Sequence, residues 1–263
     1  MNRFLKRAWA EIDLDALEHN YNEIKKLAKG KDILAVVKAN AYGHGSVPVA
    51  RLMEKKAVCL KLQELGVKYY GVSNLWEGEK LRQHGITGTI LTFGYTDEDY
   101  FDELLEYGIT QTAGSVQYAK QLSDYAVSKG VKLPVHIKVN TGMTRVGIDS
   151  QQEMLDIIAM PGLDCKAAYT HFAAADSLDP SDVEYTDRQQ EKLMKIAKDK
   201  GLLIHSQNSG GIIYHGDFGG DIVRAGVILY GHYPNYPLEV PFDMKSVMTV
   251  KSVVSQLKTI PAG

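Results

Sequence analysis

Short runs rich in β-branched residues alternate with amphipathic stretches of helical length along almost the whole chain of 263 residues. Alternation repeated every ~25 to 30 residues predicts βα units that share one parallel sheet. The expected strands are 11–15, 32–38, 69–73, 89–94, 109–113, 133–140, 163–172, 202–208 and a last one near 221–229. The expected helices are 13–30, 48–66, 75–85, 97–108, 115–130, 151–160 and 182–200. Counted from the segment 11–15, this makes about eight βα units.

A doubly wound sheet and a closed (β/α)₈ TIM barrel both satisfy this pattern. Eight units fit a barrel of about 250 residues. No GxGxxG turn follows the first expected strand, which weakens a dinucleotide-binding reading. We therefore expect an α/β protein whose residues 1–235 form a (β/α)₈ barrel.

The texture changes after Tyr230, where a stretch with several prolines precedes the alternating segment 245–263. The alternation predicts an antiparallel strand, and one strand alone forms no stable sheet. Two interpretations follow. Residues 236–263 are a linker and the first strand of an incomplete carboxyl-terminal β-domain, or this strand pairs elsewhere.

Composition limits the partners. The net charge is -2 and no basic stripe is visible, which argues against nucleic acid and anionic membranes. No run approaches ~20 apolar residues, so no transmembrane helix is expected. The two cysteines share no CxxC spacing and favour a reduced, cytoplasmic compartment. The histidines lack ligand spacing, so no metal site is expected.

The buried run 33–37 leads directly into Lys38, which is followed by the loop ANAYGHG. In a barrel, reactive groups collect at the carboxyl ends of strands. An amine in a partly dry pocket becomes a usable nucleophile or base. The alternative is a lysine that extends to solvent from a strand end.

Five segments carry a resemblance to a known family. They are AVVKANAYGHG (35–45), KVNTGMTRVG (138–147), THFAAAD (170–176), QNSGG (207–211) and IVRAGVILYG (222–231). In order and spacing they resemble the alanine racemases, and the opening RAWAEIDLDALEHN (7–20) resembles that family's first strand and helix. The resemblance implies a pyridoxal 5'-phosphate (PLP) enzyme with a barrel, a following β-domain and a head-to-tail homodimer.

The resemblance implies that Lys38 holds PLP covalently and acts as a base or acid. It assigns the cofactor phosphate to a set of loop residues at the barrel mouth: Tyr42, Asn208, Ser209, Gly226 and Val227. Glycine permits close approach of the main chain to an anion, and a helix start favours one. The alternatives are a loop aromatic at position 42, a plain helix cap at NSGG and a bend at Gly226.

The remaining catalytic residues follow from the same resemblance. Arg224 would face the pyridine nitrogen, and His171 would hydrogen-bond Arg224. Arg145 would contact the phenolic oxygen of the cofactor or the substrate carboxylate. Lys138 matches a carbamylated lysine, whose anionic end would orient Arg145; unmodified, the two form a like-charge pair. The alternatives are a surface salt bridge for Arg224 and a satisfied core histidine for His171.

The expected function is interconversion of L- and D-alanine, which supplies D-alanine for cell-wall peptidoglycan. The family's second base, a tyrosine, comes from the partner chain's carboxyl-terminal domain, and Tyr230, Tyr233 and Tyr236 do not occupy its motif. We therefore expect this chain alone to bind PLP but to racemise poorly. The alternatives are a serine or broad-specificity racemase, a single-domain PLP-binding homeostasis protein, and a barrel without a cofactor. Asn140 stands where many relatives have Asp.

Overall fold

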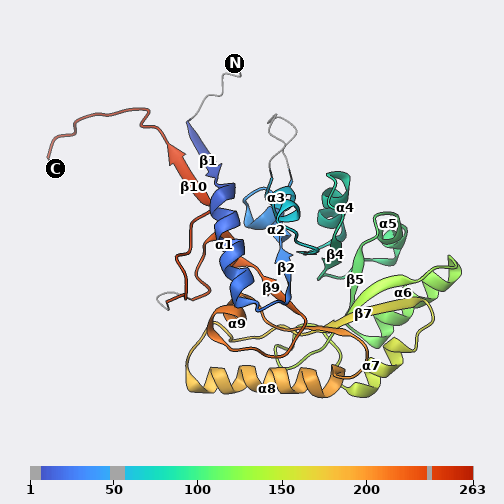
Figure 1. Ribbon diagram of the computed structural model, residues 1–263. Helices are drawn as coiled ribbons and strands as arrows, with labels where there is room; N and C mark the ends of the chain where they lie inside the picture. Colours follow the sequence, from blue (N-terminus) through green and yellow to red (C-terminus); the bar gives the residue numbers. More distant parts are fainter. Residues whose placement is uncertain (1–6, 48–56, 236–238, 263) are drawn as a thin grey trace.

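A computed structural model describes residues 7–47, 57–235 and 239–262, and its centre is an eight-stranded parallel sheet (Figure 1). The strand order is β8-β7-β6-β5-β4-β3-β2-β9, so β2 to β8 lie side by side in chain order and β9 lies beside β2. The strands are β2 (Asp32–Val36), β3 (Tyr69–Val72), β4 (Thr89–Thr92), β5 (Thr110–Ala113), β6 (Leu133–Lys138), β7 (Leu163–Tyr169), β8 (Leu203–His205) and β9 (Ile222–Ala225).

Main-chain hydrogen bonds also join the two ends of this sheet. The Asp221 amide donates to the Ile204 carbonyl and the Arg224 amide to the Gln207 carbonyl, each across 2.8 Å. Because these bonds link β9 to β8, the sheet closes on itself. The expected (β/α)₈ barrel is confirmed.

Helices cover the outside of the barrel (Figure 1). They are α1 (Leu14–Leu27), α3 (Val58–Glu64), α4 (Leu75–Gln83), α5 (Phe101–Glu106), α6 (Val116–Ser128), α7 (Gln151–Ile158), α8 (Pro180–Ala197) and α9 (Ser209–Tyr214). The expected helix 97–108 is split into a 3₁₀ turn, η1 (Glu98–Tyr100), and α5. Residues 48–56 of the expected helix 48–66 lie outside the described residues, as does Tyr236.

One expected barrel strand lies elsewhere. The segment counted as the first βα unit forms β1 (Ala8–Ile12), which pairs antiparallel with β10 (Met248–Ser252) in a separate two-stranded sheet. The expectation that it opens the barrel is therefore wrong, and the expected strand near the end of the chain does find a partner. The strand can leave the barrel because β9 takes the place beside β2.

The last expected strand, 221–229, is also shorter than predicted. β9 ends at Ala225, and a 3₁₀ helix η2 (Val227–Tyr230) follows. Gly226 stands between them with φ -111° and ψ -109°. That conformation turns the chain out of the sheet at the carboxyl end of the barrel.

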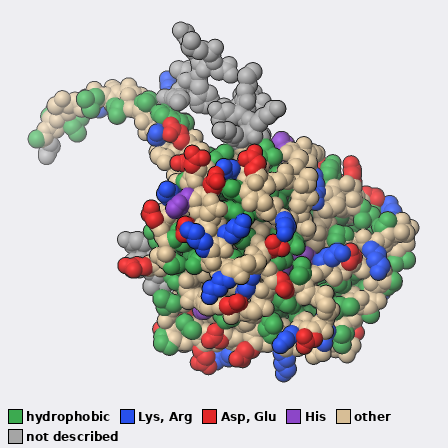
Figure 2. Space-filling view, in the orientation of Figure 1, with side chains coloured by type: hydrophobic (Ala, Val, Ile, Leu, Met, Phe, Trp, Pro, Cys, Tyr) green, Lys and Arg blue, Asp and Glu red, His purple; other side chains and the backbone are tan. Residues whose placement is uncertain are grey.

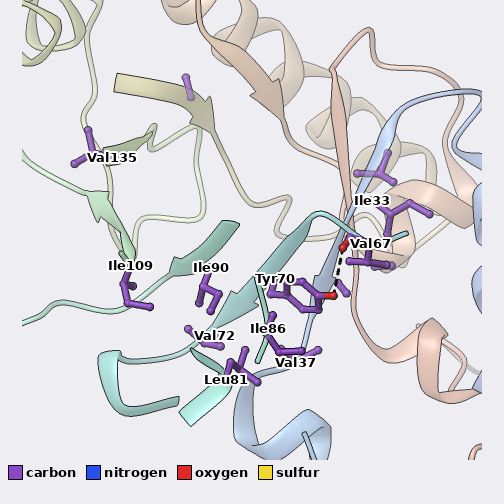
Figure 3. Close-up of a cluster of buried hydrophobic side chains, with 14 of the residues drawn as sticks. Ile33, Val37, Val67, Tyr70, Val72, Leu81, Ile86, Ile90, Ile109 and Val135 are labelled. Atoms are coloured by element: carbon purple, nitrogen blue, oxygen red, sulfur yellow. Dashed lines mark hydrogen bonds between the residues drawn. The ribbon is translucent and has the colours of Figure 1, made fainter. Parts of the chain in front are cut away.

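Successive residues of a strand serve two separate cores. Leu34 and Val36 pack with Leu91 and Ile222 in a small cluster, whereas Ile33 on the other face of β2 joins the main cluster. The main cluster includes buried helical side chains, so it fills the layer between strands and helices, as Figure 3 shows around Tyr70. The small cluster therefore fills the barrel interior.

The surface carries no dominant charge on the face shown in Figure 2, where acidic and basic side chains are interspersed. In the described part of the chain, no helix is both long and apolar enough to cross a membrane.

Candidate active site at the carboxyl mouth of the barrel

The predicted site residues come together at the carboxyl ends of the barrel strands. Lys38 follows β2, Lys138 is the last residue of β6, and Arg224 lies near the end of β9. His171 follows β7, and Arg145 lies in the loop after β6. This end of a TIM barrel is the end at which active sites form, because the loops that shape the pocket begin there.

Lys38 is half-buried, with its Nζ 6.0 Å from the centroid of the Tyr42 ring. The turn that follows it, labelled α2 (Lys38–Tyr42) in Figure 1, is left-handed. Four consecutive non-glycine residues, 39–42, have φ between 51° and 56°. Each such residue costs about 1–2 kcal/mol, somewhat less for asparagine. A strained run of this length persists only where its surroundings hold it.

Two side chains hold this turn. Glu77, on α4, accepts a hydrogen bond from the Ala39 amide at 2.7 Å and from the Ser73 amide and hydroxyl at 2.8 Å. Asn40 Oδ1 accepts from the amide and hydroxyl of Ser46, at 2.9 and 3.0 Å. Glu77 was not among the predicted site residues, and its position inside a helix gave no sign that it reaches the lysine loop.

Tyr42, Ser209 and Gly226 converge from three separate segments. The Gly226 amide donates to Ser209 Oγ at 3.1 Å. A methyl group built onto Gly226 would lie 3.2 Å from the Tyr42 hydroxyl oxygen and 3.5 Å from Ser209 Oγ. Glycine thus keeps open a small space, here called the cradle, which is lined by the hydroxyl groups of Tyr42 and Ser209 and by the main chain at Gly226. Val227 begins η2 directly beside it.

Asn208, unlike Ser209, caps a helix. Its Oδ1 accepts from the Gly211 amide at 3.0 Å, so it is the N-cap of α9, and its Nδ2 donates to the Phe172 carbonyl. The helix-cap alternative therefore applies to Asn208, while Ser209 next to it faces the cradle of Tyr42 and Gly226.

Arg224 is buried, with 3% of its surface exposed, and forms no ion pair with a described carboxylate. Nη1 donates to the His205 carbonyl and Nη2 to the Ser206 carbonyl, both at 2.8 Å. Each of these nitrogens also lies 3.3 Å from an imidazole nitrogen, Nδ1 of His205 and Nδ1 of His171. Burial lowers the pKa of Arg224 to about 10, so the guanidinium stays charged at neutral pH. The surface salt bridge considered for Arg224 is excluded.

The hydrogen bonds fix the tautomers of a chain of histidines. Arginine only donates, so Nδ1 of His205 accepts and its Nε2 carries the proton. That Nε2 then donates to Nδ1 of His136, 3.0 Å away. Burial lowers the pKa of His136 to about 4 and that of His205 well below its usual value. Both imidazoles are therefore neutral.

His171 hydrogen-bonds Arg224, as the family resemblance implies. Burial first, and then the positive charges of Arg224, Arg145, Lys138 and Lys38, lower its pKa to about 3. Arg224, Arg145 and Lys38 are positively charged groups near His171, and Lys138 adds a further charge while it is protonated. The mouth of the barrel is therefore electropositive and favours an anionic ligand.

Lys138 is buried, with 6% of its surface exposed. Its Nζ donates to the Val139 carbonyl at 2.8 Å and lies 3.4 Å from Thr170 Oγ1. Burial, followed by repulsion from Arg224 and then from Arg145, lowers the pKa of Lys138 to about 7. The predicted like-charge conflict is present, and loss of the proton from Lys138 relieves it.

Arg145 itself is exposed, in a loop organised by Asn140. Asn140 Oδ1 accepts from the amides of Gly142 and Thr144, and its Nδ2 donates to Asp149 at 3.0 Å. The amide supplies both donor and acceptor here, and an aspartate would meet Asp149 as a like charge.

Three buried residues at this site were missed: Tyr169, His136 and His205. Tyr169 stacks on His205 with centroids 4.7 Å apart, its hydroxyl lies 2.9 Å from Thr112 Oγ1, and Lys138 and Arg224 lie over its ring at 5.5 Å. Lys138, Tyr169 and His205 are partners in register across β6, β7 and β8. The sequence did contain a sign of these residues, because apolar strands carry polar residues at every second position. His136 and Lys138 on β6 are an example, and this spacing places both on one face of the strand.

No group of three or more metal-ligating side chains lies together among the residues that the structure describes. The donors at the barrel mouth are instead cationic or neutral, and suit a phosphorylated organic ligand better than a metal.

Comparison with known proteins agrees with this site. The family model "Alanine racemase, N-terminal domain" matches residues 12–234. Alanine racemase of Clostridium perfringens (strain SM101) is 36% identical over 271 residues, covering 99% of this chain and 67% of its own length. That of Desulforamulus reducens is 37% identical over 267 residues, covering 97% and 69%.

Solved structures give the same relation. Alanine racemase of Clostridium difficile 630 superposes with a TM-score of 0.84 at 34% identity, over 95% of this chain and 65% of that chain. Histidine racemase from Leuconostoc mesenteroides subsp. sake superposes with a TM-score of 0.82 at 27% identity, over 95% and 67%. The chain thus spans about two thirds of the length of these relatives. By its matched residues, its barrel and its site, it belongs to the alanine racemase family, in the region of that family's amino-terminal domain.

Proposed function

We propose that this chain binds PLP and takes part in the racemisation of alanine. The observation that carries the proposal is the half-buried Lys38 amine at the mouth of a barrel that also presents the Tyr42–Ser209–Gly226 cradle and the buried Arg224. The cradle fits a phosphate, because two hydroxyl groups and glycine main chain surround a space without a Cβ. The positive charges of Arg224 and Arg145 near His171 suit the negative charge of the cofactor.

In this proposal Lys38 holds PLP, while Tyr42, Ser209, Gly226 and Val227 bind its phosphate. Nη1 and Nη2 of Arg224 are occupied by protein acceptors, and no described residue accepts from Nε. Nε is therefore the donor available to the pyridine nitrogen. An arginine opposite that nitrogen keeps it unprotonated, since a guanidinium does not give up its proton.

Bound PLP supplies the electron withdrawal that makes the α-proton of an amino acid acidic. Once the substrate amine has displaced it from the cofactor, the free Lys38 amine would remove or return that proton on one face of the substrate. Arg145 lies near enough to lower the pKa of Lys138 and His171, and in this proposal it contacts the phenolic oxygen of the cofactor or the substrate carboxylate. A carbamylated Lys138 would be an anionic partner for Arg145.

The proton on the opposite face needs a second group. Tyr230 does not supply it, because it is fully buried and its hydroxyl donates to the Val36 carbonyl at 3.0 Å. We propose that this group belongs to a carboxyl-terminal β-domain of a partner chain in a homodimer, with residues 236–263 as the linker and first strand of such a domain. The barrel by itself would then bind PLP but racemise poorly. The free cysteines, Cys59 and Cys165, fit a cytoplasmic protein.

A second candidate function concerns which amino acid is racemised. The histidine racemase that superposes with a TM-score of 0.82 shares this barrel fold. The similar fold favours a second candidate function, racemisation of another amino acid or of several. D- and L-forms of alanine, serine and histidine should therefore be assayed in parallel.

The test begins with the 263-residue chain, PLP and borohydride reduction, followed by peptide mass spectrometry. The expected result is one PLP group fixed on Lys38, and none in a Lys38→Ala variant. Exchange of the α-hydrogen of alanine in D₂O then separates a racemase from a PLP carrier, because a carrier leaves that hydrogen in place. Absence of any fixed PLP, or fixation unchanged in Lys38→Ala, would overturn the proposal.

A further inference from the structure

We infer that Glu77 is a positioning residue for Lys38. Its carboxylate holds the peptide group that joins Lys38 to Ala39. The inference rests on the proposed role of Lys38 in binding PLP. Glu77 does not touch the lysine amine, and it acts through the backbone of the next residue.

The contacts of Glu77 connect two neighbouring barrel strands. Oε1 accepts from the Ala39 amide at 2.7 Å, and this amide belongs to the peptide that joins Lys38 to Ala39. Oε2 accepts from the amide and the hydroxyl of Ser73, just after β3. Since β2 and β3 pair in parallel, one carboxylate holds together the carboxyl ends of both strands.

The position of Glu77 on α4 makes this reach specific. Asn74 is the N-cap of α4 and accepts from the Glu77 amide at 3.1 Å, which places Glu77 in the first turn. A glutamate there ordinarily serves its own helix start. Glu153 on α7 does so, accepting from the Ser150 amide and hydroxyl and from the Asp149 amide. Like Glu153, Glu77 accepts hydrogen bonds from the amide and hydroxyl of a serine, here Ser73. Its third hydrogen bond comes from Ala39, outside its own helix start.

That third contact meets the most strained part of the site. The left-handed run begins at Ala39, where the Glu77 bond is made, and Asn40 is held separately by Ser46. The run ends at Tyr42, whose hydroxyl lines the cradle. If the Glu77 bond is lost, relaxation of the turn therefore displaces Lys38 at one end and Tyr42 at the other.

The experiment compares Glu77→Gln with Glu153→Gln, two isosteric changes that remove the same charge from equivalent helix starts. The first measurement uses the protein without PLP, and follows hydrogen exchange of the Ala39 amide. We expect exchange about tenfold faster in Glu77→Gln and within about twofold of wild type in Glu153→Gln, because a charged acceptor roughly doubles the strength of such a bond. Thermal melts confirm that both variants fold.

The second measurement is the PLP dissociation constant with the visible spectrum of the lysine-bound cofactor and its pH dependence. We expect Glu77→Gln to bind PLP about tenfold more weakly, with a changed spectral pH profile, and Glu153→Gln to match wild type. If wild type binds PLP and Glu77→Gln matches it in exchange, affinity and spectrum, the inference on Glu77 is overturned and the proposed function stands. If wild type fixes no PLP on Lys38, the proposed function fails, and the inference on positioning fails with it, whatever the exchange data show about the turn.

Discussion

The Arg224 guanidinium donates from Nη2 to Nδ1 of His171 across 3.3 Å. Because arginine has no acceptor, the proton of His171 must lie on Nε2, and the imidazole must be neutral. Arg224 also donates to Nδ1 of His205, whose Nε2 donates to His136, so a chain of hydrogen bonds with fixed tautomers extends from the barrel mouth into its interior.

The first prediction concerns the protonation of these histidines. With the pKa of His171 lowered to about 3 and that of His136 to about 4, neither ring should titrate between pH 5 and 8. Nitrogen-15 NMR of the imidazoles checks this, with exposed His84 as the internal comparison. A midpoint near 6.5 for His171 would contradict the hydrogen-bonding assigned to it.

The second prediction follows for stability. The pKa of His136 is lower in the folded than in the unfolded chain, so the unfolded state binds the extra proton between about pH 6.5 and 4. The free energy of unfolding therefore falls as the pH drops through this window, by about 2–3 kcal/mol for this one residue. Urea unfolding at pH 7 and at pH 4.5 measures the loss. A stability that is unchanged or higher at pH 4.5 would argue against a neutral buried His136.

The third prediction concerns modification of Lys138. A pKa of about 7 leaves much of this amine unprotonated at neutral pH, and only an uncharged amine adds to CO₂. We expect a carbamate signal in carbon-13 NMR with labelled bicarbonate, increasing from pH 6 to 8 and lost in Lys138→Ala. Lys166, exposed and paired with Asp164, is the control position. A signal that survives in Lys138→Ala but disappears in Lys166→Ala would place the modification elsewhere.

The fourth prediction tests the phosphate cradle. In Gly226→Ala, the new methyl group lies against the Tyr42 hydroxyl and Ser209 Oγ and occupies the space for an anion. PLP affinity should fall at least about tenfold, and a thermal melt checks that the variant folds. Gly216→Ala is the matched control, because a methyl group there meets nothing within 4 Å. Equal affinity in the two variants would exclude Gly226 from the cradle.

The fifth prediction concerns the segment that follows the barrel. Asn20 on α1 is fully buried, and its Nδ2 donates to the carbonyls of Leu229 and Lys245 while its Oδ1 accepts from the Lys245 amide. Asn20→Ala leaves these groups without partners and should cost about 2–4 kcal/mol of unfolding free energy. Asn235→Ala, which removes one exposed hydrogen bond, should cost under about 1 kcal/mol. Similar losses in the two variants would show that Asn20 does not hold this segment.

Much of the architecture followed from the sequence alone. Periodicity located the barrel strands to within a few residues, because a parallel strand covered on both faces is nearly all apolar and a surface helix is not. The family resemblance identified Lys38, His171, Arg145 and Arg224, and they lie at one edge because the carboxyl ends of parallel strands all meet there.

Only the tertiary structure decided the remainder. β1 pairs with β10 because residues 240 positions apart meet in space, and no local pattern distinguishes such a strand from a barrel strand. Glu77 on α4 reaches the lysine loop only in the folded chain. Strand register places Lys138, Tyr169 and His205 beside one another on three neighbouring strands. Register and burial also set the low pKa values of Lys138 and His171, since desolvation depends on what packs around a group and not on its neighbours in sequence.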